Sequence, residues 1–251
     1  MPTKTKNRAN FAAHKTVFIT GAATGIGLAT AKLLLSEGYN VVIFSLTKPE
    51  AHDLEILHAL PNALILQGDI TNEKQVKIAL QKTIKKFGSL DVLINNAGIS
   101  QKKLFIDSIP QEWDKLISVN IKGTLIVTHE ALRYLKKGGL ASPKRREGGL
   151  IINIASGSAL HAVSHLSMYS LTKAGILNFT QSLDTEIKKD GVRAIVITPG
   201  STETALFEKA SPGKNPLYKP EDVAAVIVDT ISGKQKPDKY RIVNPFKHLY
   251  R

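Results

Sequence analysis

The amino-acid sequence predicts an α/β fold, a doubly wound three-layer sandwich in which a parallel seven-stranded sheet lies between two layers of helices. Short apolar runs rich in β-branched residues alternate with longer stretches of helical periodicity along most of the chain. The short runs are continuously apolar, which is typical of strands buried on both faces of a parallel sheet. Strands and helices that alternate in this way pair in parallel through right-handed crossovers.

The first half of the chain carries clear boundary residues. Gly38 and Gly88 are placed to end helices, Pro49 stands near a helix start, and Thr71 or Asn72 can cap the helix that follows. We therefore predict, in order, a strand at 16–20, a helix at 26–37, a strand at 41–44, a helix at 49–60, a strand at 63–66, a helix at 72–87 and a strand at 92–94.

The second half continues the alternation with longer helices. Gly191 is placed to terminate a helix, and Pro220 precedes another. The predicted elements are a helix at 111–137, a strand at 150–154, a helix at 167–189, a strand at 192–198, a helix at 221–231 and a short strand at 240–243. The stretches 138–149 and 201–219 have no regular pattern, and long loops of this kind are often functional or mobile.

The domain organisation follows from this pattern. The chain has neither a repeat at a solenoid period nor a linker that would split it. We expect a flexible basic tail at 1–14, followed by a single domain at 15–251 that includes the irregular loop at about 201–219.

Composition narrows the classes of function. Cysteine is absent from the 251 residues, which excludes disulfides and thiolate metal sites, and we predict no metal site. No window reaches the roughly 18 uninterrupted apolar residues of a membrane helix, and the basic start lacks the apolar core of a signal peptide. We therefore expect a cytoplasmic protein that does not bind membranes.

The net charge of +13 favours anionic ligands through its long-range field. The basic residues form only short clusters, at 4–8, 136–137 and 144–146, without aromatic side chains among them. A nucleic-acid-binding surface needs such aromatic residues on one face. We therefore predict no nucleic-acid partner.

A glycine-rich turn at 20–27 joins the first predicted strand to the first predicted helix. Glycines at such a junction let the backbone approach a pyrophosphate, and the helix N-terminus offers free N–H groups with partial positive charge. The spacing here, through Gly21, Gly25 and Gly27, is Gly-x-x-x-Gly-x-Gly. The turn predicts a dinucleotide site, and a tight turn without a ligand is the alternative interpretation.

The choice of dinucleotide depends on the end of the second strand, where a carboxylate would bind the ribose 2′-hydroxyl of NAD. Ser45 stands at that position, followed closely by Thr47 and Lys48. No carboxylate is present to repel a 2′-phosphate, and these three side chains could donate to one. The sequence therefore favours NADP(H) over NAD(H).

A tyrosine and a lysine four residues apart form the predicted catalytic pair. Tyr169 and Lys173 share one face of the predicted helix at 167–189, thirteen residues after Ser156. A nearby ammonium favours the phenolate and lowers the tyrosine pKa from its usual value near 10, which suits a general acid or base. Ser156 follows the fifth strand, at the edge where ligands bind in such sheets, and can polarise a carbonyl oxygen.

Together these motifs resemble the short-chain dehydrogenase/reductase superfamily, in its branch of single Rossmann-type domains of about this length. The resemblance extends over about 15–243 and depends on seven motifs in order. They are TGAATGIG at 20–27, Asp69 in GDIT, NNAG at 95–98, Asn120 in SVNIKG, Ser156 in NIAS, YSLTK at 169–173 and PGSTET at 199–204.

The resemblance implies a role for each matched residue. Tyr169 would be the catalytic acid or base, and Lys173 would lower its pKa and hold the nicotinamide ribose. Ser156 would orient the substrate oxygen, and Asn120 would hold a water in a proton relay that reaches Lys173. Asn95 would brace the sheet. The implied cofactor-binding residues are Gly21, Thr24, Gly25, Ile26, Gly27, Ser45, Asp69, Ile70, Asn96, Ala97, Gly98, Tyr169, Lys173, Pro199, Gly200, Thr202 and Thr204.

The chain departs from the family pattern in three places. Ser45 replaces the acidic marker of NAD-dependent members, and Thr24 stands where NADP-preferring members often carry a basic residue. These two departures do not decide between NAD(H) and NADP(H), beyond the preference for NADP(H) stated above. The stretch 138–149 is longer and more basic than the usual connection, and we interpret it as decoration rather than as a contact surface.

We therefore expect an NAD(P)(H)-dependent oxidoreductase that moves a hydride between its cofactor and a carbonyl or secondary alcohol. Ser156, Tyr169, Leu206 and Phe207 would contact a small, apolar ketone or alcohol. The alternatives are a dehydratase or epimerase on the same scaffold and a non-catalytic dinucleotide-binding sensor, against which the intact catalytic residues argue. By analogy with the family, we expect a homodimer or a homotetramer.

Overall fold

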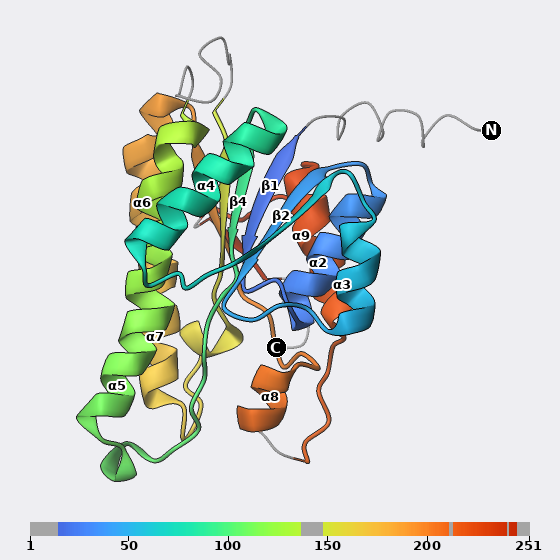
Figure 1. Ribbon diagram of the computed structural model, residues 1–251. Coiled ribbons are helices and arrows are strands. Elements are labelled where there is room, and N and C mark those ends of the chain that lie inside the picture. Colours follow the sequence, from blue (N-terminus) through green and yellow to red (C-terminus); the bar gives the residue numbers. More distant parts are fainter. Residues whose placement is uncertain (1–14, 137–147, 211–212, 240, 245–251) are drawn as a thin grey trace, which may run out of the picture.

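The computed structural model describes residues 15–136, 148–210, 213–239 and 241–244 (Figure 1). The tail expected at 1–14 and most of the basic stretch at 138–149 lie outside the described residues. Among the described helices, none has the length and apolar character needed to cross a bilayer. The described part also contains no cluster of three or more side chains that could hold a metal ion.

A seven-stranded parallel sheet forms the middle layer, as predicted, with the strand order β3-β2-β1-β4-β5-β6-β7. Because β4 pairs with β1 on the side opposite β2, the order reverses direction at β1 and β4. Ligands bind at such a switch point, outside the carboxyl ends of the strands. The strands are β1 (Thr16–Thr20), β2 (Asn40–Ser45), β3 (Ala63–Gln67), β4 (Val92–Asn95), β5 (Leu150–Ile154), β6 (Arg193–Ile197) and β7 (Ile242–Val243).

Helices cover both faces of the sheet (Figure 1). On one face lie α2 (Gly25–Ser36), α3 (Ala51–His58) and α9 (Pro220–Ile231), and on the other lie α4 (Glu73–Phe87), α6 (Thr124–Leu135) and α7 (Ser167–Ile187). Two shorter helices stand near the carboxyl edge of the sheet, α5 (Pro110–Ile117) and α8 (Ala205–Ala210).

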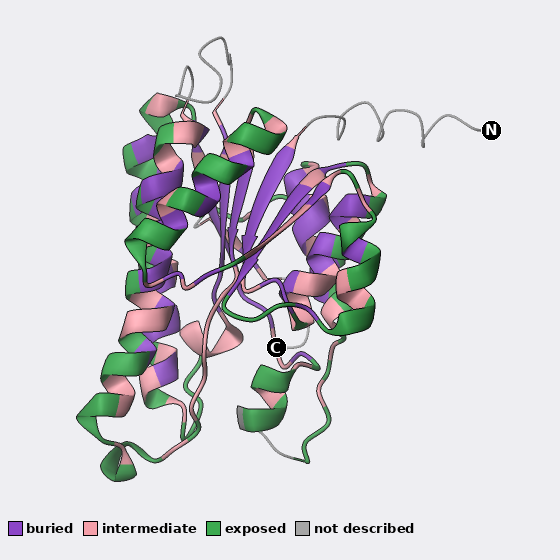
Figure 2. Cartoon of the chain, in the orientation of Figure 1, coloured by how far each residue is buried: buried purple, intermediate pink, exposed green. Residues whose placement is uncertain are grey.

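Two apolar cores, one on each face of the sheet, hold the layers together (Figure 2). Neighbouring strand residues point to opposite faces, so Phe18 packs with Leu80 of α4 while Ile19 packs with Leu34 of α2. All four side chains are fully buried. Burying a side chain of this size stabilises the fold by about 1.5–3 kcal/mol, so the sheet provides a rigid base for the loops at its carboxyl edge.

The predicted helix boundaries are confirmed where local chemistry sets them. Gly38, Gly88 and Gly191 follow helices with positive φ values of 87°, 78° and 76°, which glycine adopts without steric cost. Asn72, one of the two predicted caps, accepts a hydrogen bond from the Gln75 N–H at 3.1 Å through its Oδ1.

Two predicted segments differ from the structure. The single helix expected at 111–137 is divided by η2, a π-helical turn at Ser118–Gly123 that separates α5 from α6. The stretch 201–219, expected to be irregular, contains α8. The first difference arises from tertiary contacts of Asn120, described below. The second arises because a six-residue helix is too short to show a clear period.

Candidate active site

Four loops meet at the carboxyl edge of the sheet and carry most of the predicted site residues. They follow β1, β4, β5 and β6, which are neighbours in the sheet. The glycine turn follows β1, the segment Asn96 to Gly98 follows β4, Ser156 follows β5, and Pro199 follows β6. Because parallel strands end at the same edge, residues far apart in the sequence are brought together there.

The glycine turn is closely packed against the loop after β4. Gly21 has a φ of +64°, and a Cβ placed on it would lie 2.6 Å from the Ala97 Cα. A Cβ on Gly27 would lie 2.6 Å from the Asn96 Nδ2 and 2.7 Å from the Gly21 carbonyl oxygen. No larger residue fits either position. The turn therefore depends on glycine for its close packing, and it places the N-terminus of α2, with its free N–H groups, at the switch point.

Hydrogen bonds fix the loop after β4 to this turn. The Asn96 Nδ2 donates to the carbonyl oxygens of Thr20 and Gly21 at 3.1 and 3.0 Å. The backbone N–H groups of Asn96 and Ala97 both donate to the Thr20 Oγ1 at 3.1 Å. The structure thus places Asn96 and Ala97 beside the glycine turn, and the Asn96 side chain supports that turn.

Asn120 lies in the π-helical turn η2 and is almost fully buried. Its Oδ1 accepts a hydrogen bond from the Ile99 N–H at 2.8 Å, and its Nδ2 donates to the Ile99 carbonyl at 2.9 Å. The same Nδ2 donates to the Thr172 Oγ1 at 3.1 Å. Asn120 therefore links the loop after β4 to α7, the helix that carries the predicted catalytic pair.

Tyr169 and Lys173 share one face of α7, as their spacing predicts. Both side chains are also buried. Ser156 lies close enough to the Tyr169 hydroxyl for its side chain to favour the phenolate. The Lys173 Nζ donates to the Ile154 carbonyl at 2.9 Å and lies 5.7 Å from the centre of the Tyr169 ring. Gly98 completes the group, since a Cβ on it would lie 3.4 Å from this Nζ.

Burial dominates the ionisation of this pair. It raises the pKa of Tyr169 to about 12, opposed by the hydrogen bond from Ser156, which favours the phenolate. It also lowers the pKa of Lys173 to about 8, because the ammonium is removed from water. The sequence-based expectation of a phenol pKa below its usual value is therefore wrong for this structure, because burial outweighs the groups that favour the phenolate. The low exposure of both groups cannot be read from their spacing.

The residues predicted for the adenosine end follow β2 and β3. Ser45 ends β2, where it is buried, and no carboxylate occupies that position. The Asp69 Oδ1 accepts hydrogen bonds from the backbone N–H and the Oγ1 of Thr71, both at 2.8 Å. Ile70 packs against η2, since a Cβ on Gly123 would lie 2.5 Å from its Cδ1. Asp69 and Ile70 thus have local structural contacts in addition to their predicted place near the adenine.

The loop after β6 reaches back to the glycine turn. A Cβ on Gly25 would lie 3.1 Å from the Thr204 Cγ2. The Thr204 Oγ1 accepts a hydrogen bond from the Phe207 N–H at 3.1 Å, at the start of α8, and the Thr202 Oγ1 donates to the Gly200 carbonyl at 3.1 Å. Pro199, the first residue of the loop motif, accepts a hydrogen bond from the Gly157 N–H at 2.8 Å. These bonds hold the loop between the glycine turn and the Ser156 segment.

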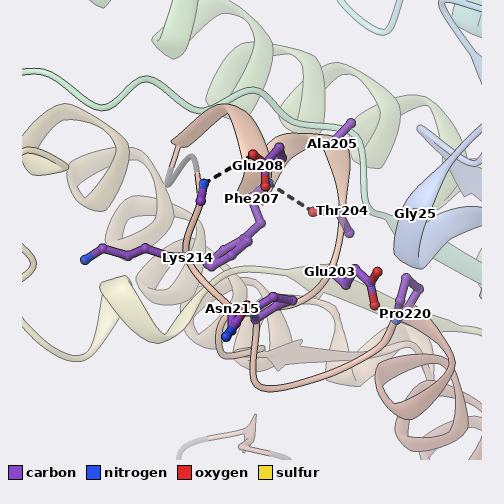
Figure 3. A pocket seen from close by; sticks show the side chains of 11 residues that line it. Gly25, Glu203, Thr204, Ala205, Phe207, Glu208, Lys214, Asn215 and Pro220 are labelled. Atoms are coloured by element: carbon purple, nitrogen blue, oxygen red, sulfur yellow. Dashed lines mark hydrogen bonds between the residues drawn. The ribbon is translucent and has the colours of Figure 1, made fainter.

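A pocket of about 650 Å³ lies between this loop and the glycine turn (Figure 3). Phe207 lines it, whereas Leu206, Ser156 and Tyr169, the other predicted substrate contacts, do not. The Lys214 side chain extends away from the other labelled side chains. The lining residues are Gly25, Glu203, Thr204, Ala205, Phe207, Glu208, Gly213, Lys214, Asn215, Pro216 and Pro220.

Some residues that support the site carry no signal in the sequence. The Asn95 Nδ2 donates at 2.8 Å to the Asn153 Oδ1 and to the Thr128 Oγ1, and the Asn153 Nδ2 donates at 2.8 Å to the Thr180 Oγ1. These bonds join β4 and β5 to α6 and α7. Asn95 thus braces the sheet, as expected. Its partners were not predicted, because only the fold brings them to it.

The fold and site define a class of protein. A doubly wound parallel sheet, a crowded glycine turn at its switch point and a buried tyrosine–lysine pair beside it are features of a dinucleotide-dependent oxidoreductase. The model of the short chain dehydrogenase family matches residues 15–215, and the chain belongs to this family.

Similar proteins agree with this assignment. An uncharacterized oxidoreductase of Staphylococcus aureus (strain MRSA252) is 33% identical over 214 residues, which cover 85% of this chain and 89% of that protein. The 3-ketoacyl-(acyl-carrier-protein) reductase of Brucella melitensis, complexed with NADH, is 27% identical with a TM-score of 0.82, covering 93% of this chain and 97% of that chain. ElxO with NADP bound is 27% identical with a TM-score of 0.78, covering 94% and 99%. The Brucella melitensis structure contains NADH, and the ElxO structure contains NADP.

Proposed function

We propose that the protein transfers a hydride between a nicotinamide dinucleotide and a carbonyl or secondary alcohol, with Tyr169 as general acid or base. The observation that carries this proposal is the burial of Tyr169 and Lys173 together on one face of α7, with the Lys173 Nζ 5.7 Å from the centre of the Tyr169 ring, beside Ser156 at the carboxyl edge of the sheet. A buried phenol beside a second hydroxyl can pass its proton to a substrate oxygen that binds within reach of both.

In the reducing direction, Tyr169 gives its proton to the carbonyl oxygen while Ser156 donates a hydrogen bond to the same oxygen. A nicotinamide dinucleotide held beside this pair would supply the hydride for the new C–H bond. Lys173 holds positive charge near the phenol and favours the phenolate that remains. Asn120 fixes the loop at Ile99 and, as we propose, orients a water that returns a proton through Lys173. Oxidation of an alcohol follows the same steps in reverse.

The chain's own residues fit such a cofactor. The glycine turn provides bare backbone for the pyrophosphate, and the loops after β4 and β6 touch or approach that turn. We propose that the residues named in the sequence analysis hold the dinucleotide, with Ser45 and Asp69 at its adenosine end and Lys173 and Thr204 at its nicotinamide end. Leu206 and Phe207 on α8 would cover an apolar substrate, since α8 stands over the same edge of the sheet.

The proposed activity predicts that the purified protein oxidises NADPH only when a suitable carbonyl compound is added. A panel of ketones, quinones and keto-esters is incubated with NADPH, and the loss of cofactor absorbance is compared with the alcohol formed. One alcohol is expected for each NADPH consumed. Product formed without cofactor consumption would instead indicate a dehydratase or an epimerase. NADPH binding without turnover across the panel would indicate a sensor.

For the cofactor, we propose that NADPH binds more tightly than NADH, because Ser45 can donate to a 2′-phosphate. Fluorescence titration at fixed salt compares the two Kd values. Ser45→Asp is expected to reverse this order, so that NADH binds about tenfold or more tightly than NADPH. A carboxylate there repels the 2′-phosphate and accepts a hydrogen bond from the ribose. Leu46→Asp places the same charge one residue later and controls for net charge. Equal affinities in the wild type would contradict the preference.

A further inference from the structure

Ser156 has a second neighbour that the proposed mechanism does not use. Ser156 precedes the short 3₁₀ turn η3 (Gly157–Ala159), and Ser158 lies within that turn. The Ser158 N–H donates to the Ser156 Oγ at 3.2 Å, and the Ser158 hydroxyl donates to the same oxygen at 3.0 Å. Tyr169, whose pKa the Ser156 side chain lowers, is the third neighbour of this oxygen.

The bonding capacity of a hydroxyl restricts how these three contacts can be arranged. A serine hydroxyl accepts two hydrogen bonds and donates one. The backbone N–H of Ser158 can only donate, so it fills one acceptor position of the Ser156 oxygen. When the Ser158 hydroxyl fills the other, the only remaining capacity of Ser156 is its own hydrogen. That hydrogen then points toward the third neighbour, the Tyr169 oxygen.

We propose that Ser158 is a positioning residue that holds Ser156 as a hydrogen-bond donor, whose single hydrogen is directed to the Tyr169 oxygen in the free enzyme and to the reacting carbonyl oxygen when substrate is bound. This inference rests on the function proposed above and assigns a role to a residue that no catalytic motif contains. A donating Ser156 stabilises the negative charge that develops on either oxygen, as hydrogen-bond donors do at an oxyanion.

Loss of the Ser158 hydroxyl would leave one acceptor position of Ser156 unfilled. The Tyr169 O–H could then donate to Ser156 and would no longer be directed toward the substrate. The same change removes the hydrogen bond that opposes the effect of burial on the Tyr169 pKa. The pKa of Tyr169 is therefore expected to rise further, and proton transfer to become slower.

Kinetics of Ser158→Ala, Ser158→Thr and the control Ser164→Ala test the proposal. Ser158→Ala is expected to lower kcat by a factor of about five, the effect of one net hydrogen bond, with KM unchanged. The limb of the pH–rate profile that reports Tyr169 should move to higher pH. Threonine keeps the hydroxyl and should restore both values. Ser164 is an exposed serine in the following loop and should leave both unchanged.

A titration that needs no turnover separates this proposal from the proposed function. The tyrosinate absorbance of each protein is followed with pH, and the same protein carrying Tyr169→Phe is subtracted so that only Tyr169 is seen. Ser158→Ala should show less tyrosinate than the wild type at each pH below the alkaline unfolding transition, which far-UV circular dichroism locates, even if no substrate is found. An unchanged titration, a rise in KM alone, or a loss of kcat that threonine does not restore would each overturn the proposal.

Discussion

Replacing Tyr169 by phenylalanine is expected to lower kcat by about 10²–10⁴-fold, the usual contribution of a positioned general acid or base. The substitution removes one oxygen and keeps the ring of Tyr169, a buried residue of α7. The fold and the cofactor contacts should therefore persist. Steady-state rates measure the loss, and fluorescence titration should show cofactor affinity close to that of the wild type.

Tyr134→Phe provides the matched control for this experiment. Tyr134 is a partly buried tyrosine of α6 that packs against the core on the other side of the sheet from α2. The same atom is lost there, but none of the four site loops contains it. Its kcat should equal that of the wild type. If Tyr169→Phe also kept near-normal turnover, the role proposed for the phenol would be wrong.

Gly21→Ala is expected to lower the free energy of unfolding by about 2–5 kcal/mol and to abolish cofactor binding. The positive φ of +64° costs about 1–2 kcal/mol for an L-residue. The new Cβ would also lie 2.6 Å from the backbone Cα of Ala97, and overpacking of this kind costs a further ~1–3 kcal/mol. Urea unfolding measures the stability, and fluorescence titration measures cofactor binding.

Gly38→Ala separates the two causes. Gly38 also has a positive φ, +87°, but no atom lies within 4 Å of a Cβ placed on it. It should therefore lose only the strain term of about 1–2 kcal/mol and keep cofactor binding. Equal destabilisation in the two variants would mean that the close approach of the glycine turn to Ala97 contributes nothing.

Much of the fold could be predicted because its boundaries are chemical and local. Gly38, Gly88 and Gly191 end helices through a backbone conformation that glycine favours, and Asn72 begins one through its side chain. The strands read as apolar runs because both of their faces are covered. The π-helical turn η2 has no such marker, since the contacts of Asn120 with Ile99 and Thr172 join segments that are distant in the sequence.

The candidate site divides in the same way. The glycine turn and the pair Tyr169 and Lys173 could be found because each depends on spacing within one element. Ser158 acts through contacts with another side chain, and nothing in its local sequence distinguishes it. Asn153 belongs to the NIAS motif, but its partner Thr180 lies on another element. The ionisation of the phenol was predicted in the wrong direction because spacing indicates which groups are neighbours but not how much water reaches them.

The π-helical turn η2 also makes the segment from α5 to α6 sensitive to a change in its length. One residue added to an ordinary α-helix rotates everything beyond it by about 100°. The wide turn at Ser118–Gly123 absorbs such an excess locally, so Asn120 faces α7 while Val127 and Ala131 still face the sheet. Removal of a single residue from this segment would bring the two halves out of phase. The segment could then keep either the hydrogen bonds of Asn120 with Ile99 or the packing of Val127 and Ala131 in the core, but not both.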